Sequence, residues 1–178
     1  NSYRDNSWVG RGWDLDCGAI QRSTKRGLNY SANDYVVVKD GSHTALVPRS
    51  GWDGAYGTKI EGAFTKYTFN GANGWEAIAR DGTKYFYVQT AASRQENANG
   101  VFKWCLDRVE DVNGNYLTIS YVKDQEEIYL EQIDYTGNTH GLDTTNYDRF
   151  YLEDRLDKPA MYASNAAVMT AKRLKSIE

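Results

Sequence analysis

The chain has 178 residues, enough for one domain of ordinary size. Its 21 Lys and Arg against 24 Asp and Glu argue against a general nucleic-acid binder, which needs surplus cations, and no run of 18 apolar residues exists to span a membrane. Ile, Leu and Val are scarce, but 14 Tyr and 5 Trp replace their bulk, and 16 Gly against 2 Pro indicate frequent turns. Because the chain begins at Asn1 without an apolar leader, we expect residues 1–178 to be one all-β domain cut from a larger protein.

The predicted strands follow one another along the chain between turn residues. Asp40-Gly41 separates runs 35–38 and 44–47, Asp81-Gly82 separates 75–79 and 84–88, and Asn113-Gly114 separates 106–109 and 116–122. Such pairs between β-forming residues are typical of hairpins with a type I′ turn, in which both central residues have positive φ. With further runs at 64–69, 128–135 and 147–152, we expect about nine antiparallel strands in hairpins and a meander.

The alternation within the predicted strands indicates a thin sheet with one semi-polar face. In 116–122, Leu117, Ile119 and Tyr121 share one face, and the opposite face carries polar and mixed side chains. Such strands suit a twisted, curved wall with little or no helix. We expect polar loops at 94–100 and 137–146, and a loop or one short helix at 160–173.

No catalytic or metal-binding motif emerges from the residues. His43 and His140 lie in turn-like stretches without a nucleophile elbow nearby, and the spacings of a zinc site are absent. Residues 111–115 look like the start of a calcium loop, but the twelfth position is Val122. Turn chemistry explains them better: Asp111 caps a turn in which Asn113, Gly114 and Asn115 adopt positive φ. We therefore expect no cofactor and no metal.

Carboxylates, cysteines and tryptophans leave alternatives open. Asp14 and Asp16, or Glu126 and Glu127, could pair as acid and base, although solvated side chains are favoured. Cys17 and Cys105 are favoured as buried thiols over a disulfide, which the sequence does not settle. The tryptophans are favoured as core residues over a platform for sugar rings; they are Trp8, Trp13, Trp52, Trp75 and Trp104.

An ordered set of short motifs runs through nearly the whole chain. It comprises Gly10-Arg11-Gly12-Trp13-Asp14-Leu15, Ile20-Gln21-Arg22-Ser23-Thr24-Lys25-Arg26-Gly27, Trp75-Glu76, Asp81-Gly82-Thr83-Lys84-Tyr85, Trp104-Cys105-Leu106-Asp107-Arg108-Val109, Asp111-Val112-Asn113-Gly114-Asn115 and Arg173-Leu174-Lys175-Ser176-Ile177. This set resembles the amino-terminal region of the SpvB family, which includes the B subunits of bacterial toxin complexes. The motif over residues 104–115 also looks like the core of the tyrosine-aspartate (YD) repeats of Rhs proteins.

The resemblance implies a segment of a β-sheet cocoon that encloses a toxic polypeptide in a secreted bacterial protein. Implied partners are other segments of the same shell, a C-type toxin subunit and the enclosed polypeptide, with no nucleic acid and no membrane insertion. The family's Glu-x-Glu transferase motif is absent from the sequence, so we assign no catalytic residue and expect a structural segment rather than an enzyme. The alternatives are an aromatic-rich carbohydrate-binding β module and a glycoside hydrolase fragment that uses Asp14, Asp16 or Glu76.

Overall fold

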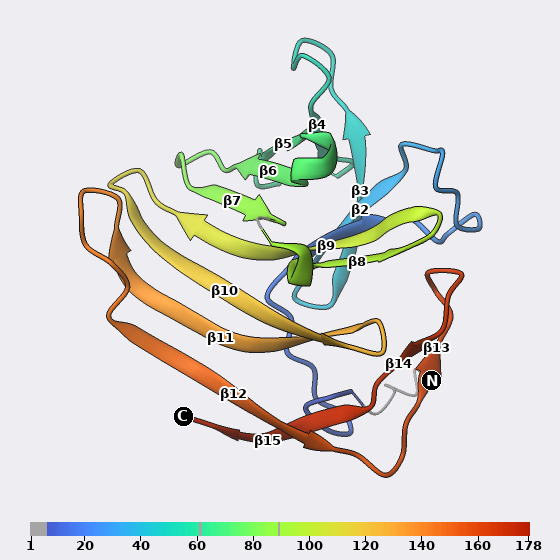
Figure 1. Cartoon of the computed structure of the whole chain (residues 1–178). Coiled ribbons are helices and arrows are strands. Elements are labelled where there is room, and N and C mark those ends of the chain that lie inside the picture. Colours follow the sequence, from blue (N-terminus) through green and yellow to red (C-terminus); the bar gives the residue numbers. More distant parts are fainter. Residues whose placement is uncertain (1–6, 61, 89) are drawn as a thin grey trace.

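A computed structural model describes residues 7–60, 62–88 and 90–178, and nearly all of its regular structure is one antiparallel sheet (Figure 1). The sheet contains β1 (Ala19–Arg22), β2 (Tyr35–Lys39), β3 (Ser42–Pro48), β4 (Tyr56–Thr58), β5 (Lys66–Phe69), β6 (Trp75–Ile78), β7 (Lys84–Tyr87), β8 (Arg94–Asn97), β9 (Gly100–Glu110), β10 (Asn115–Asp124), β11 (Glu127–Asn138), β12 (Asn146–Asp154) and β15 (Lys172–Ile177). A separate pair joins β13 (Ala160–Met161) to β14 (Val168–Met169). Within the described ranges, the helical segments are two 3-10 turns, η1 (Gly71–Asn73) and η2 (Ala91–Ser93). The predicted all-β fold with little helix is confirmed.

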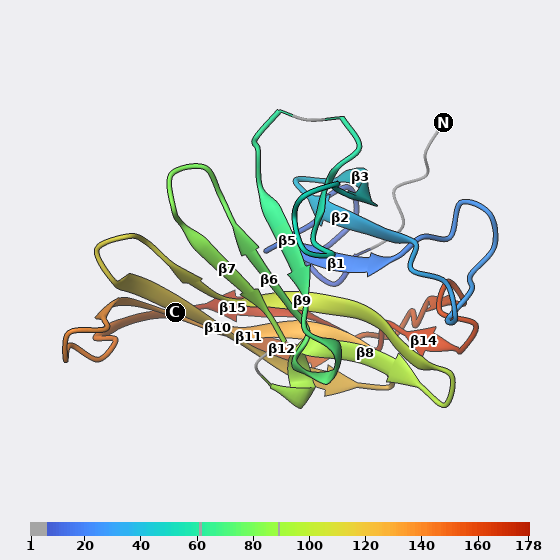
Figure 2. The same cartoon turned by 90° about the horizontal axis from the view of Figure 1, so that it is seen from above.

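The sheet closes on itself at one end and stays open at the other. β1 pairs with β2 and also with β9, where Ile20 lies opposite Trp104, so β1 to β7 and β9 form an eight-stranded, barrel-like ring. β9 is long enough to pair with β7 through Phe86 and with β10 through Thr118 at the same residue, Arg108. From there β10, β11, β12 and β15 continue as a twisted open sheet beside the ring (Figures 1 and 2).

The core of the ring is aromatic. Trp75 is 1% exposed, and its ring centroid lies 4.8 Å from those of Tyr35 and Phe69 and 5.4 Å from that of Tyr56. Trp104 closes the cluster at 5.9 Å from Tyr35. Most of these contacts are edge-to-face, which is the geometry that the ring quadrupoles favour. The aromatic residues thus supply the bulk that the few aliphatic ones cannot.

One face of the sheet is semi-polar over seven neighbouring strands. Leu117, Ile119 and Tyr121 of β10, which the alternation places on one face, pack against the core. The opposite side of β10 belongs to a cross-strand row that register pairing carries from β5 to β12. Its members are Thr68, Glu76, Phe86, Arg108, Thr118, Asp134 and Tyr147. Side chains of mixed character, partly exposed, therefore form one continuous surface of the wall.

Two of the three predicted hairpin turns are not of the predicted type I′. Asp40 and Gly41 both have positive φ, at 52° and 71°, as a type I′ turn requires. At the other two turns only Gly82 and Gly114 do, and the Gly amide donates three residues back, to Ala79 or Asp111. These are three-residue turns closed by a glycine bulge, so the positive φ expected at Asn113 and Asn115 is wrong.

Several elements differ from their predictions because pairing, not local sequence, forms them. The expected loop at 94–100 contains β8, which folds onto β9 with Arg94 opposite Trp104. The expected strand at 106–109 is only part of β9, which starts at Gly100. The short helix considered at 160–173 is absent, since that segment holds β13, β14 and the start of β15. Residues 139–145 do form a turn and loop.

Candidate functional site

Most of the motif residues singled out in the sequence lie in three places: the ring core, a pair of hairpin turns at one end of the sheet, and a turn near the amino terminus. In the ring core, Ile20 is fully buried opposite Trp104, and Leu106 is 7% exposed. Gln21 lies opposite Lys103 of β9. This part of the motif set builds the junction that closes the ring.

Arg22 fastens that junction with its guanidinium. Nε donates to the Val101 carbonyl at 2.8 Å and Nη1 to the Ala32 carbonyl at 2.9 Å. The cation also lies 5.4 Å from the ring centres of Tyr30 and Tyr35 and 5.8 Å from that of Trp104. A planar guanidinium can make both kinds of contact at once, whereas a lysine ammonium cannot. The arginine of the Ile-Gln-Arg motif therefore has a structural task.

The Asp111 carboxylate organises the turn between β9 and β10. Oδ1 accepts from the amides of Asn113 at 2.8 Å and Asn115 at 2.9 Å, and Oδ2 accepts from the side-chain amide of Asn115 at 2.8 Å. These hydrogen bonds, led by the one from the Asn115 side chain, lower the pKa of Asp111 below its usual value. Asn138 donates to the Asn115 side chain at 2.8 Å, so the turn is tied to the end of β11.

The two glycine-bulge turns contact each other. A Cβ on Gly82 would lie 2.5 Å from Cγ1 of Val112, so the turn between β6 and β7 packs directly on the turn between β9 and β10. Asp81 accepts the Thr83 amide at 3.0 Å, which lowers its pKa in the same way. The Asp-Gly and Asn-Gly motifs thus form one stacked pair of turns.

The remaining motif residues of β9 are held by partners from other elements. Asp107, which is 4% exposed, accepts from the Ser93 hydroxyl at 2.8 Å and the Thr90 amide at 3.3 Å. Arg108 pairs with Glu110 at 2.8 Å, and its guanidinium lies 4.0 Å from the ring centre of Tyr116. Each of these side chains is engaged within the fold.

The first two tryptophans of the chain lie in the turn near the amino terminus and differ in exposure. Ser7 and Gly10 form a β-bridge, and the Ser7 hydroxyl donates to the Trp13 carbonyl at 2.6 Å. Trp13, the motif residue that follows Gly12, is 75% exposed, whereas Trp8 is 9% exposed. The core position favoured for the tryptophans is therefore confirmed for Trp8 and wrong for Trp13. The burial of Trp8 depends on contacts with β11, β12 and β15, which no local pattern reveals.

Several titratable side chains act electrostatically on Lys103 of β9. Negative charge on Cys105, when its thiol ionises, and then on Glu127, Asp16 and Asp14 raises the pKa of Lys103 against the effect of burial. Burial raises the pKa of Glu127, although Lys103 opposes this and the Thr170 hydroxyl donates to its carboxylate at 3.2 Å. One carboxyl group from each pair considered in the sequence, Asp14 and Glu127, therefore acts on the same lysine.

The two cysteines adjoin this group as free thiols. Burial raises the pKa of Cys17 to about 11, and Asp16 and Cys105 add to the shift. Burial also raises the pKa of Cys105, although Lys103 acts in the opposite direction. Raised pKa values leave little thiolate at neutral pH, so neither thiol has the character of a catalytic nucleophile.

The structure supports only part of the hydrolase alternative, which requires two carboxyl groups in one cleft, one of them with a raised pKa. Burial raises the pKa of Glu127 and the charge of Asp14 adds to the shift, but Glu76 lies in β6 opposite Thr68 and Phe86. Two surface hollows of about 410 and 490 Å³ are lined by other residues. The first is lined by Ala63, Ala79, Arg80 and Asp81, and the second by Val109, Asp111, Asn115, Tyr116, Leu117, Tyr135, Thr136 and Gly137. Among the described residues, no three His, Cys, Asp or Glu side chains could hold a metal ion, and no helix could cross a membrane.

The carbohydrate-binding alternative depends on exposed tryptophans in a groove. Trp8, Trp75 and Trp104 are buried, Trp52 is half-buried, and Trp13 stands exposed in the amino-terminal turn. The larger hollow is lined by Tyr116 and Tyr135, but the polar side chains of its rim, such as Asp111, already bond within the protein. His43 and His140 are exposed, and His140 lies in a turn as expected, whereas His43 lies in β3.

Comparisons with known proteins find similarity in structure only. No protein-family model and no curated protein matches the sequence. The N-terminal domain of effector protein SpvB from Salmonella typhimurium strain LT2 superposes with a TM-score of 0.80 at 16% identity, over 99% of this chain and 79% of that one.

Two toxin-complex structures match as well. The TcdB2-TccC3-TEV structure has a TM-score of 0.76 at 15% identity, over 97% of this chain and 11% of that one. The Photorhabdus luminescens Tc holotoxin pore has a TM-score of 0.81 at 16% identity, over 99% of this chain and 12% of that one. The expected resemblance is thereby confirmed: the chain has the fold of the SpvB N-terminal domain and of a small part of these Tc toxin chains.

Proposed function

We propose that this chain is one structural segment of the β-sheet wall of a toxin-complex-like or SpvB-like protein and has no catalytic activity of its own. The observation that carries the proposal is the coverage of the structural matches. Nearly the entire chain superposes on Tc toxin chains, and the superposition covers only 11–12% of those chains. A unit that is a small part of a larger β structure has the role of a building segment.

The shape of the sheet supports a wall. A ring with an aromatic core supplies stability, and β10, β11, β12 and β15 extend from it as an open sheet. The row of mixed side chains from Thr68 to Tyr147 gives that sheet a surface that is neither strongly apolar nor of one charge. Such a surface can face an unfolded polypeptide without holding it by apolar contact.

In this proposal residues 1–178 are one β domain of a longer secreted protein. Its partners are neighbouring segments of the same wall or a C-type toxin subunit, and the wall encloses a toxic polypeptide. The motif residues listed in the sequence serve the architecture: Arg22 closes the ring, and Asp111 and Gly114 shape a turn at the end of the sheet. The burial of three of the five tryptophans favours this function over carbohydrate binding.

Electron cryomicroscopy of a longer protein that contains this segment tests the proposal. We expect the ring and the open sheet to form part of the boundary of a hollow body. A protease-protection assay on the same particle checks enclosure, because an enclosed polypeptide is cut only after the particle is opened. A ring that stands apart as a separate globular unit, or a body without a hollow, would refute the proposal.

A further inference from the structure

The connection between β12 and β15, residues 155–171, leaves the main sheet as a separate arm that contains β13 and β14 (Figure 1). The Arg155 amide closes the base of the arm by donating to the Ala171 carbonyl at 3.0 Å. Within the arm, the buried apolar side chains are those of Val168 and Ala171, whereas Tyr162 is 69% exposed. A segment with so little buried apolar surface opens more readily than the strands beside it.

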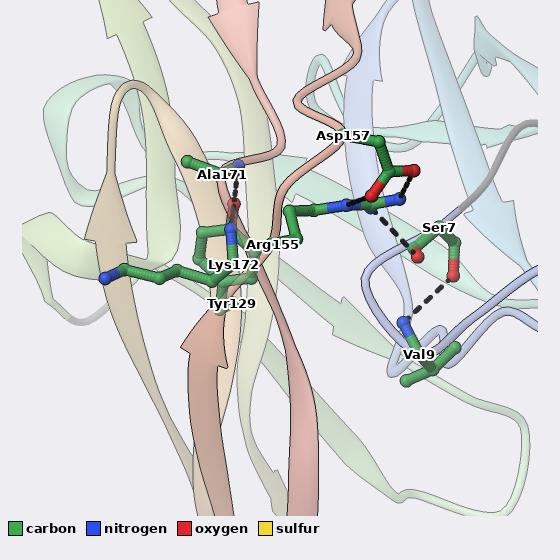
Figure 3. A network of polar contacts seen from close by, with 7 residues as sticks. All are labelled: Ser7, Val9, Tyr129, Arg155, Asp157, Ala171 and Lys172. Carbon is green, nitrogen blue, oxygen red and sulfur yellow. Dashed lines mark hydrogen bonds and ion pairs between the residues drawn. The ribbon is translucent and has the colours of Figure 1, made fainter.

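The base of the arm is bonded to the open sheet. The Tyr129 hydroxyl of β11 accepts the amides of Ala171 and Lys172, at 2.9 and 3.2 Å (Figure 3). The Arg155 guanidinium, which is buried, donates to the Asp157 carboxylate at 2.8 and 3.2 Å. These bonds fix the base and leave the outer part of the arm to be held by other contacts.

The tip of the arm is bonded to the ring side of the molecule. The Ser164 carbonyl accepts from the Tyr30 hydroxyl at 2.7 Å and from the Asn97 side-chain amide at 2.8 Å. Ser164 is 3% exposed. Tyr30 lies between β1 and β2 of the ring, and Asn97 ends β8, which pairs with β9. The arm therefore reaches from the open sheet to the ring.

The returning strand of the arm binds the turn between β10 and β11. The Met169 amide of β14 donates to the Gln125 carbonyl at 3.2 Å. The Gln95 side chain of β8 donates to the Glu126 carbonyl of the same turn at 3.0 Å. Both carbonyls of the turn are thus held from outside the hairpin, one by the arm and one by β8.

This turn is strained. Asp124 and Glu127 pair across it, so Gln125 and Glu126 form a two-residue loop, and their φ values are 50° and 66°. Asn-Gly or Asp-Gly is typical of such a loop, because both positions require positive φ. The left-handed conformation is unfavourable for glutamine and glutamate. Both side chains are exposed, so their burial does not offset the strain.

We propose that the arm is a releasable clasp: its docking holds Gln125 and Glu126 in the strained conformation, and the strain is released when the arm opens. Residues with unfavourable φ persist where surrounding contacts hold them, and the Met169 amide supplies one such contact. Once the arm leaves, the closing pair of the hairpin opens and both residues return to negative φ. Release loosens one connection between the ring and the open sheet. The inference concerns the chain by itself and does not rest on the proposed wall function.

Amide hydrogen exchange of the whole chain, followed by NMR, tests the clasp through Met169, whose bond to Gln125 exists only while the arm is docked. Gln125→Asn/Glu126→Gly supplies residues that tolerate positive φ. Because strain then no longer favours opening, Met169 exchange should slow about 10-fold. The matched control is Asp40→Gly, which relieves a φ of 52° in the turn between β2 and β3, outside the clasp, and should leave Met169 exchange unchanged.

The other outcomes of this experiment overturn the inference. Unchanged or faster Met169 exchange in the double variant shows that the turn does not relax when the arm opens. Equal slowing by Asp40→Gly shows that the arm opens only with the whole fold. A Met169 amide without protection in the native chain shows that the arm is not docked. A double variant that fails to fold shows that the turn carries no strain to relieve.

A second pair of variants tests the tip of the arm. Tyr30→Phe removes the hydroxyl that donates to Ser164 and keeps the ring, so it should speed Met169 exchange about five-fold. Tyr162→Phe removes a hydroxyl from the exposed side of the arm and should leave the exchange unchanged. Equal effects of the two variants would show that the tip does not hold the arm, and the clasp would then be refuted.

Discussion

Replacing Gly114 by alanine tests the account of the turn between β9 and β10. Gly114 has a φ of +79°, and a Cβ there would lie 2.2 Å from the Thr139 hydroxyl oxygen. Its carbonyl also accepts the Thr139 amide at 2.9 Å. Gly51, in the loop between β3 and β4, has the same φ of +79°, but a Cβ there would meet nothing within 4 Å. The two glycines therefore differ in surroundings and not in φ.

The loss of unfolding free energy in Gly114→Ala has two contributions, the left-handed φ and the contact with Thr139. A left-handed conformation costs a non-glycine residue about 1–2 kcal/mol, so Gly51→Ala should lower the free energy of unfolding by that amount. At Gly114 the Thr139 side chain must also leave its rotamer or the hydrogen bond must stretch, which adds about 1 kcal/mol. In a chain of this length, each kcal/mol lowers Tm by roughly 2–4 °C.

Urea denaturation measures both contributions. It is carried out on the native chain, Gly51→Ala, Gly114→Ala, Thr139→Ala and the Gly114→Ala/Thr139→Ala double variant. Gly51→Ala and Thr139→Ala are the two single variants that lack the clash. We expect the double variant to lose no more unfolding free energy than the sum of the losses in these two variants. The reasoning fails if Gly114→Ala is no more destabilising than Gly51→Ala, or if the coupling energy between positions 114 and 139 is zero.

Three further predictions follow from the structure. Asp111→Asn places an amide against the Asn115 side-chain donor and should lower the stability of the fold. Because folding lowers the pKa of Asp111, the stabilisation that its carboxylate provides is present above the unfolded pKa and is lost as pH falls through the folded pKa. Thermal melts of the native chain between about pH 2 and 6 should therefore show a dependence on acid that the variant lacks. Trp75→Ala should cost about 3–5 kcal/mol in urea denaturation, against less than about 0.5 kcal/mol for the exposed Trp13→Ala, and equal losses would contradict the assigned core. Cys17, with a pKa of about 11, should react slowly with a thiol reagent at neutral pH and faster as pH rises toward that value, whereas fast labelling of the folded chain at pH 7 would show that the thiol is not buried.

Turn positions were predictable because their signals are local. Each of the three Asp-Gly or Asn-Gly pairs does join two strands, since a positive φ at glycine is a property of the residue itself. The type of turn was not predictable in two cases. The extra residue of the glycine bulge depends on register, and the Asp81 and Asp111 side chains stabilise the longer turn by accepting amides beyond it.

Among the candidate residues, the part played by each depended on partners far away in the chain. Arg22 is typical of a surface residue in the sequence, yet its guanidinium reaches Val101 and the rings of the core. Trp13 carries the motif and is exposed, whereas Trp8 carries no motif and is buried. Spacing along a chain says nothing about contacts between elements 80 or more residues apart, so these roles could not be read in advance.

The sequence by itself determined that the chain is all β, where most hairpins lie, and which side chains of β10 share a face, because turn chemistry and period-2 alternation act over a few residues. Only the tertiary structure decided that β1, four residues without a strong strand signal, closes a ring against β9. It alone decided that Trp8 covers the edge at Leu174. Both pairings gain their free energy from surfaces that exist only once the rest of the sheet has formed, and no local pattern encodes such surfaces.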